Sequence, residues 1–295
     1  MLTLTTAAEL AAALAPARAR GLMIGFVPTM GALHRGHAAV VDRSVADSDL
    51  TVTSIFVNPT QFNEAGDLAA YPRTPQSDAQ LLAEHGCDYL YLPSTEDVYP
   101  NGTKSSLAAD VDLTQLTAHM EGLQRPGHFD GVVQVVSRLL EIVKPTTLYL
   151  GQKDYQQVAV VRHMVEHMRL SVRVVTVETV REPDGLALSS RNRLLSPDER
   201  RAAGRINRHL AAVAAGLRAG WPARELERLA TASIAATPLL EPEYVTVFDG
   251  HTLQPYQDGQ PVEELVVATA VRVGPVRLID NRIAYRANPS DRPGV

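Results

Sequence analysis

The stretch FVPTMGALHRGHAAVV, residues 26–41, decides the fold, because an apolar run passes through a short turn directly into a helical pattern. The apolar run GLMIGFVP begins at residue 21, and HAAVVDRSVADS, residues 37–48, has helical periodicity. A second run, DLTVTSIFV at residues 49–57, is rich in β-branched side chains. Strand, helix and strand in this order predict a βαβ unit and therefore a parallel sheet.

The alternation of strand and helix continues outward from this unit. It predicts helices at 77–86, 132–144 and 155–169, and strands at 87–93, 146–151 and 171–180. We therefore predict an α/β fold with a doubly wound, parallel, Rossmann-like sheet in a catalytic domain of residues 1–181.

The pattern changes in the last third of the chain. Residues 196–220 predict one long helix and residues 222–236 a second helix, and the runs EYVTVFDG and EELVVATAVRVG that follow predict strands. This order predicts a smaller α+β C-terminal domain, residues 182–295, which we expect to close over the active site.

Composition excludes several classes of protein. The 295 residues carry a net charge of -5 and are 45% hydrophobic, which is ordinary for a globular protein and disfavours a nucleic-acid partner. No uncharged apolar run approaches the length of a membrane span. The lone Cys87 cannot form an intrachain disulfide, and the N-terminal residues do not resemble a signal peptide. We expect a cytoplasmic protein that binds neither membrane nor nucleic acid.

Two histidines follow the carboxyl end of the first predicted strand, where ligands bind in open α/β sheets. Because His34 and His37 are three residues apart at a helix start, their imidazoles share one face beside the positive end of the helix dipole. Gly31 permits the turn, and Gly36 leaves room for a nucleotide against the backbone. The pattern favours an anion site with two proton-bearing side chains; the alternative is a turn followed by two solvated histidines.

The H-x-G-H pattern is a signature of the nucleotidyltransferase superfamily, and six segments together resemble the pantoate-β-alanine ligase family along nearly the whole chain. The resemblance implies ATP-dependent condensation of (R)-pantoate with β-alanine to pantothenate, through a pantoyl adenylate, with release of pyrophosphate and AMP. It also implies Mg2+ and a homodimer. The segments are PTMGALHRGH, SIFVNPTQF, YPRTPQSD, QRPGHFDGVV, GQKDYQQV and DGLALSSRNRLL.

Adenylation of a carboxylate drives negative charge onto the departing phosphates, so the family's site needs cations and hydrogen-bond donors. By resemblance His34, His37, Lys153 and Arg191 are catalytic. In isolation, the alternative for Lys153 and Asp154 is an exposed ion pair, and the alternative for Ser-Ser-Arg is an ordinary turn with a surface arginine. The residues implied to bind ATP are Met30, Gly31, His34, Gly36, His37, Gly151, Gln152, Lys153, Asp154, Val180, Leu188, Ser189, Ser190 and Arg191.

Asp154 is the expected Mg2+ ligand, and Asp78 is a weaker candidate. For pantoate, the resemblance implies Gln61 and Gln157 with Asn58 nearby, because neutral amides can recognise hydroxyl groups. The alternative for the NPTQF segment is a capped turn with a surface glutamine. Arg125 is expected to close over substrate or phosphate.

Three positions depart from the family's commonest pattern: Gln152 replaces a glutamate, Leu188 a methionine, and Thr60 a methionine or leucine. None of them removes a charged catalytic group, so we expect effects on affinity rather than on the reaction.

Two further motifs carry less weight. HMVEH, residues 163–167, has the spacing of a zinc-protease pattern but lacks a further expected ligand, and GLQRPGH, residues 122–128, has P-loop spacing without the P-loop lysine. Two other functions remain open at this point: a nucleotidyltransferase that stops at nucleotide transfer, and a non-enzymatic nucleotide-binding regulator.

Overall fold

The computed structural model of the chain describes residues 1–62, 65–103, 108 and 110–286. The chain forms two compact units, and segments of the sequence alternate between them. The final segment of the second unit begins at Thr179, close to the boundary predicted from sequence. Two short inner segments also belong to the second unit, which no change in composition indicates. The first unit comprises Met1–Leu113, Gly122–Gln152 and Val160–Glu178, and the second comprises Thr114–Glu121, Lys153–Ala159 and the chain from Thr179 onward.

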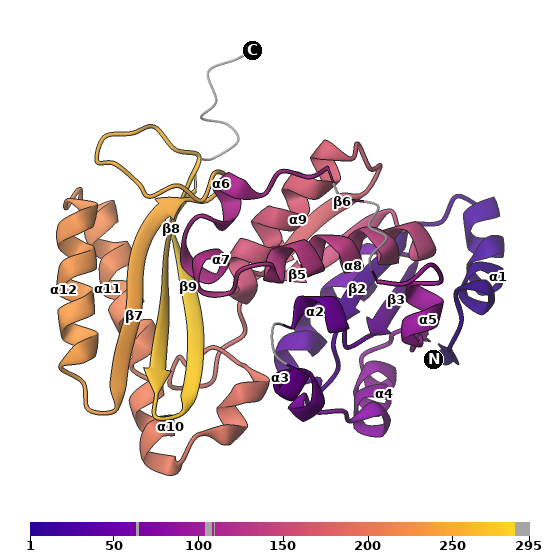
Figure 1. Ribbon diagram of the computed structural model, residues 1–295, viewed down its shortest axis with the longest axis horizontal. Coiled ribbons are helices and arrows are strands. Elements are labelled where there is room, and N and C mark those ends of the chain that lie inside the picture. The colour runs from indigo at the N-terminus through magenta and orange to yellow at the C-terminus, as the bar shows by residue number, and fades with distance from the viewer. Residues whose placement is uncertain (63–64, 104–107, 109, 287–295) are drawn as a thin grey trace. The chain divides into compact units, whose positions relative to one another are not determined.

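A six-stranded sheet forms the centre of the first unit, in the order β1-β4-β3-β2-β5-β6 (Figure 1). All of its pairings are parallel, which confirms the predicted Rossmann-like fold class. The strand order reverses between β2 and β5, and ligands bind at such a switch point in doubly wound sheets. The strands are β1 (Leu2–Leu4), β2 (Ile24–Thr29), β3 (Leu50–Ile55), β4 (Tyr89–Tyr91), β5 (Thr147–Gly151) and β6 (Arg173–Val177).

Helices bury both faces of this sheet, since consecutive residues of β2 and β3 are buried although their side chains alternate between faces. Val27 belongs to a cluster with Val40 and Val41 of the helix after β2. The helices wholly within this unit are α1 (Ala7–Ala19), α2 (Arg35–Asp47), α3 (Ala65–Ala70), α4 (Pro75–Glu84), α5 (Thr95–Val98) and α8 (His128–Val143), with the 3-10 helix η1 (Pro59–Gln61).

Three helical segments cross between the units along the chain: α7 (Met120–Gln124), the 3-10 helix η2 (Gln152–Asp154) and α9 (Tyr155–His167). Each has residues assigned to both units. The motif at the end of β5 therefore passes from the first unit into the second within η2.

An antiparallel three-stranded sheet, β7-β8-β9, forms the second unit with helices packed against it (Figure 1). α11 contacts β8 and β9, and α12 contacts β7 and α11. This confirms a smaller α+β unit at the C-terminus. Its elements are α6 (Thr114–Thr117), the 3-10 helix η3 (Ser190–Leu194), α10 (Pro197–Ala203), α11 (Ile206–Arg218), α12 (Ala223–Ala235), β7 (Leu240–Asp249), β8 (Glu264–Val273) and β9 (Val276–Arg286).

The single helix predicted at 196–220 is wrong, because the chain forms two helices with a break at Gly204. A Cβ at Gly204 would lie 2.3 Å from Asp184 Oδ2, so another segment approaches the backbone closely there. Asp184 is held in place by two hydrogen bonds from the Arg200 guanidinium. A tertiary contact therefore lies at the break, and helical periodicity does not report it.

Candidate active site

His34 and His37 lie at the start of α2, directly after the end of β2. The His34 Nδ1 atom accepts a hydrogen bond from the Gly36 N–H at 3.1 Å, and His37 Nδ1 accepts from the His34 N–H at 3.3 Å. The two ring centroids are 4.2 Å apart, which confirms that the imidazoles share one face. Because both Nδ1 atoms act as acceptors, the neutral rings carry their protons on Nε2. The pair therefore presents two N–H donors at a helix N-terminus.

The loop before these histidines has an unusual backbone, with φ of +85° at Gly31 and +50° at Ala32. Asp78 stabilises it: one carboxylate oxygen accepts from the Ala32 N–H at 2.9 Å and the other from the Leu33 N–H at 2.8 Å. The Thr74 hydroxyl donates to the same carboxylate. Asp78 is almost fully buried. Its side chain therefore holds the loop that leads to His34, a role that sequence reasoning did not assign to it.

A polar cluster follows the end of β3, the strand beside β2. Asn58 and Gln61 are both buried, so the alternative of a surface glutamine is wrong. Asn58 Nδ2 donates to Gln61 Oε1 at 3.2 Å, and Gln61 Nε2 lies 2.8 Å from the Met30 sulfur. The Tyr99 hydroxyl donates to Asn58 Oδ1 at 2.9 Å, and burial raises the pKa of Tyr99 to about 12, which keeps it a neutral donor. The carboxyl ends of two neighbouring strands thus share one network.

His128 joins Arg125 to this cluster, which sequence reasoning missed. Its Nδ1 atom lies 3.0 Å from the Gln61 backbone oxygen, and its Nε2 atom lies 3.1 Å from an Arg125 guanidinium nitrogen. Gly131 also contributes, since its carbonyl accepts from Asn58 Nδ2, and a Cβ there would lie 2.4 Å from the Thr60 carbonyl oxygen. The signal in the sequence was the family segment QRPGHFDGVV, from which only Arg125 was taken as a site residue.

At the end of β5 is Gly151, a second position in the first unit where a ligand could come close to the backbone. A Cβ at Gly151 would meet only Val40, at 3.9 Å, so protein packing does not itself require glycine there. Gln152 is buried. In η2, Lys153 Nζ lies 3.4 Å from Asp154 Oδ1, with side chains 19% and 51% exposed. The lysine is largely covered and the carboxylate is open to solvent, which differs from an exposed ion pair.

In the second unit, Gln157 is half-buried at the start of α9. Its neighbour Gln156 has a different role, because its amide donates to the carbonyls of Leu116 and His119 and so holds the α6 segment. Tyr155 is buried, and its hydroxyl lies within hydrogen-bond distance of the Gly250 carbonyl and of the Glu264 carboxylate. These two residues anchor the motif around Gln157.

The ALSSRN segment, also in the second unit, follows a short hairpin. The Ser189 hydroxyl accepts from the Arg191 N–H at 3.3 Å and begins η3, Ser190 is half-buried, and Arg191 is exposed. Leu188 is buried, and its N–H donates to the Val180 carbonyl at 3.0 Å. The backbone here is a capped turn that holds a cation and two hydroxyl groups together.

Comparison of the sequence with known proteins identifies the family to which this chain belongs. Residues 2–283 match the sequence model of the family described as pantoate-beta-alanine ligase. The chain belongs to this family. It is an enzyme, a ligase of pantoate and β-alanine, and the two other functions left open by the sequence are set aside.

Named relatives agree over nearly their whole length. The ligase is 47% identical over 276 residues to a pantothenate synthetase of Porphyromonas gingivalis, covering 94% of this chain and 96% of that protein. It is 46% identical over 287 residues to a pantothenate synthetase of Brucella canis, covering 96% of each.

Solved structures show the same fold. A pantothenate synthetase of Thermus thermophilus superposes with a TM-score of 0.88 at 43% identity, covering 97% of this chain and 100% of that one. The pantoate-beta-alanine ligase of Francisella tularensis, solved in complex with "Beta-gamma ATP" and β-alanine, gives a TM-score of 0.78 at 33% identity. It covers 96% of this chain and 98% of that chain.

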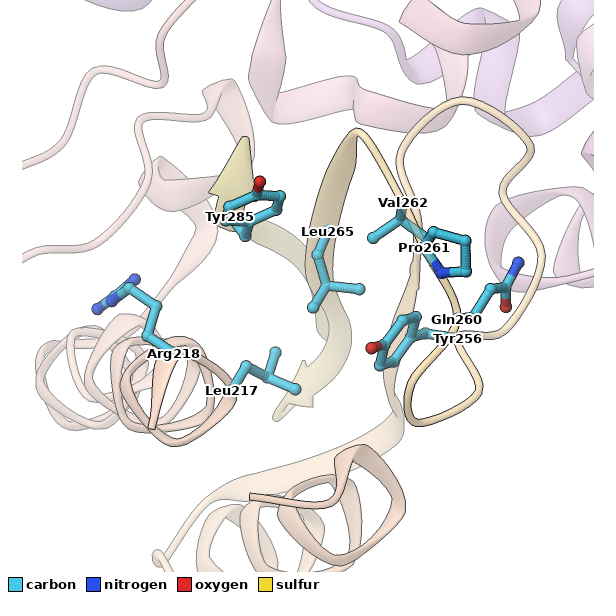
Figure 2. A pocket seen from close by; sticks show the side chains of 8 residues that line it. All are labelled: Leu217, Arg218, Tyr256, Gln260, Pro261, Val262, Leu265 and Tyr285. Atoms are coloured by element: carbon cyan, nitrogen blue, oxygen red, sulfur yellow. The ribbon is translucent and has the colours of Figure 1, made fainter. Parts of the chain in front are cut away.

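Other features of the ligase lie outside the motifs. A cavity of about 410 Å³ lies in the second unit and is lined by residues of α11, of the chain before β8, of β8 and of β9. Figure 2 shows its lining side chains, and none of the expected site residues is among them. The rings of His163 and His167 on α9 are 6.2 Å apart, and no group of three metal-ligating side chains occurs among the described residues. Within the same residues, no helix has the length and apolar character needed to span a membrane.

Proposed function

We propose that the ligase works in two half-reactions, with His34 and His37 acting on ATP during the first. A pantoate carboxylate oxygen attacks the α-phosphorus, the bond to the bridging oxygen breaks, and pyrophosphate leaves. Negative charge grows on that leaving group, and the two Nε2–H groups at the α2 N-terminus donate to it. The observation that carries this role is the occupation of both Nδ1 atoms by backbone N–H groups.

The other ATP contacts proposed from the family's motifs fit their local chemistry. Lys153 supplies a fixed positive charge for phosphate oxygens, and Arg191 with the Ser189 and Ser190 hydroxyls adds further donors. Gly151 allows the backbone to approach the nucleotide. Met30, Gln152, Val180 and Leu188 complete the proposed nucleotide surface.

For pantoate, we propose recognition by the amides of Asn58 and Gln61, with Arg125 and Gln157 as further contacts. Burial and mutual hydrogen bonding hold the first two amides in fixed orientations, which suits discrimination of hydroxyl groups. In the second half-reaction, the β-alanine nitrogen attacks the adenylate carbonyl carbon, and AMP leaves as the C–N bond forms. The β-alanine ammonium loses its proton to water before this attack.

The residues also fit a bound Mg2+. This ion usually takes one or two carboxylates together with phosphate oxygens and waters, and it would neutralise charge on the phosphates. The Asp154 carboxylate is 51% exposed and so can be reached by a hydrated ion, whereas Asp78 is buried and both of its oxygens accept backbone N–H groups. We therefore propose Asp154 as the ligand in preference to Asp78.

A single-turnover experiment tests the proposed function. Enzyme mixed with ATP, Mg2+ and pantoate should release one equivalent of pyrophosphate and retain pantoyl adenylate, and later addition of β-alanine should release AMP and pantothenate. Absence of pyrophosphate until β-alanine is present would contradict the two-step sequence. Hydrolysis of ATP without an acyl adenylate would contradict the role of pantoate as the nucleophile.

We also propose a cytoplasmic homodimer. The dimer rests on the family resemblance, and light scattering at micromolar concentration should give twice the chain mass of 32.0 kDa. A mass of one chain would contradict it. Cell fractionation checks the location.

A further inference from the structure

Two adjacent residues of β9, Asp280 and Asn281, contact the Lys153 motif segment and Arg181, which lies three residues before the segment DGLALSSRNRLL. Asn281 is 2% exposed, and its Nδ2 donates to the Lys153 carbonyl oxygen at 2.8 Å. Asp280 is 5% exposed and accepts two hydrogen bonds from the Arg181 guanidinium, at 2.7 and 2.9 Å. Neither residue was assigned a role by the sequence motifs.

Arg181 carries this attachment into the hairpin that precedes the serines. Besides Asp280, its guanidinium donates to the Gly185 carbonyl and to the Asn281 carbonyl, each at 3.1 Å. Arg181 forms an isolated antiparallel bridge with Ala187, and Ser189 follows two residues later. A planar, bidentate guanidinium restricts orientation as well as distance. The base of the hairpin is therefore fixed to the same point of β9 that holds Lys153.

The two attachments come from neighbouring residues, and the backbone N–H of Asn281 donates to Asp280 Oδ1 at 2.7 Å. β9 is paired with β8 along its whole length, which makes this point of the sheet rigid. Because these groups are largely buried, loss of the Asp280 charge removes the charged partner of Arg181, and loss of the Asn281 amide removes its hydrogen bond to the Lys153 carbonyl.

We infer that Asp280 and Asn281 are positioning residues for adenylation, which hold Lys153 and the Ser189–Arg191 turn at the spacing that the ATP phosphates require. This inference rests on the roles proposed above for Lys153 and the turn. Misplacement of a catalytic group by about 1 Å can cost on the order of 100-fold in rate. The network thus sets kcat for the first half-reaction, in which charge builds on pyrophosphate, and has little part in amine attack on the adenylate.

Two variants test this inference. Asn281→Leu removes the amide donor at similar volume, and Asp280→Asn removes the charge that pairs with Arg181. Each should lower the rate of pyrophosphate release from ATP and pantoate by about 10- to 100-fold. Conversion of supplied pantoyl adenylate by β-alanine should change less than about twofold. The matched control is Glu243→Gln, a carboxylate-to-amide change in the same sheet that faces Arg277 and Arg272 and touches neither motif segment; both half-reactions should stay within about twofold.

Amide hydrogen exchange gives a second readout that does not depend on turnover. In both variants, exchange should speed up in residues 152–155 and 181–191, while β7 and β8 keep their protection. Equal loss in both half-reactions, or unchanged exchange in these segments, would overturn the inference. If the unaltered enzyme released no pyrophosphate, the proposed function would fail, whereas the exchange pattern would still decide whether the network holds the two segments.

Discussion

The imidazole of His34 serves as the N-cap of α2, a position where serine, asparagine or aspartate is usually favoured. No backbone hydrogen bond is lost by having histidine at this position, because Nδ1 accepts from the Gly36 N–H as a serine oxygen would. What a hydroxyl or carboxylate cannot supply is the second ring nitrogen with its proton. The residue therefore combines a structural contact and a chemical group in one ring.

His37→Ala should lower kcat by about 100- to 1000-fold with a smaller effect on ATP affinity, because it removes a donor used mainly in the transition state. Pyrophosphate release without β-alanine measures this loss, and supplied pantoyl adenylate should still react. His163→Ala and His167→Ala on α9 are the controls, with expected changes below about twofold. Near-normal pyrophosphate release by His37→Ala would contradict the assigned role.

Asp78 and Asp154 should separate structural from metal-related effects. Asp78→Ala leaves the buried Ala32 and Leu33 N–H groups without their acceptor, and should lower the free energy of unfolding by about 2–4 kcal/mol. Asp154→Asn should leave stability within about 0.5 kcal/mol while raising the Mg2+ concentration needed for half-maximal rate. Urea unfolding and Mg2+ titration of the initial rate measure the two. The opposite pattern would make Asp78 the metal ligand.

At the scale of elements, α8 and η1 meet so closely that only glycine fits at Gly131. Gly131→Ala places a methyl group 2.4 Å from the Thr60 carbonyl oxygen and must displace η1, with Asn58 and Gln61 at its ends. We expect a stability loss of about 1–3 kcal/mol and a raised KM for pantoate. Gly66→Ala in α3 meets no atom within 4 Å and is the control, with both quantities nearly unchanged. An unaltered pantoate KM in a folded Gly131→Ala enzyme would rule out the pocket role of η1.

α11 should contribute a pH dependence to stability through His209. Burial, together with the nearby Arg205 charge, lowers the pKa of His209 below its ordinary value of 6.5. The unfolded chain then binds the proton more readily than the folded chain. The free energy of unfolding therefore falls as pH drops below about 7, past 6.5 and down to the lowered pKa of the folded state. His209→Gln should remove this part of the loss, measured as urea midpoints at pH 7.5 and 5.5. Equal pH sensitivity in both proteins would exclude His209, and exposed His167→Gln is the control.

Elements with strong periodicity were predictable, and those defined by tertiary contacts were not. The βαβ unit around His34 was read correctly because its apolar residues must be buried on both sheet faces. β1 has only three residues, and β9, with Arg277, Asp280, Asn281 and Arg282, lacks the apolar alternation that identifies a strand. Its polar residues instead pair with side chains or carbonyls distant in sequence.

At the scale of the whole molecule, the motifs were recognisable because each is a continuous segment at the end of one element. Fold class and family followed from them. The residues that connect the motifs could not be identified from the sequence. Asp78 and His128 contact backbone groups 45 and 67 residues away, and Asp280 contacts the Arg181 guanidinium 99 residues away. The sequence alone does not indicate such contacts, because the residues next to Asp78, His128 and Asp280 form no recognisable motif with their distant partners.

Because segments of the chain alternate between the two units, the protein cannot be cut at one point into two complete units, and one unit cannot be exchanged as a single segment. A fragment beginning at Thr179 would lack Lys153–Ala159, and the buried Glu264 carboxylate would lose its Tyr155 partner. We expect such a fragment to fold poorly alone, with weak near-UV circular dichroism, and to gain structure when a 1–178 fragment is added. An independently stable fragment would contradict this. Gene fusions that exchange only the C-terminal part between relatives should therefore fail more often than exchanges that also carry residues 114–121 and 153–159.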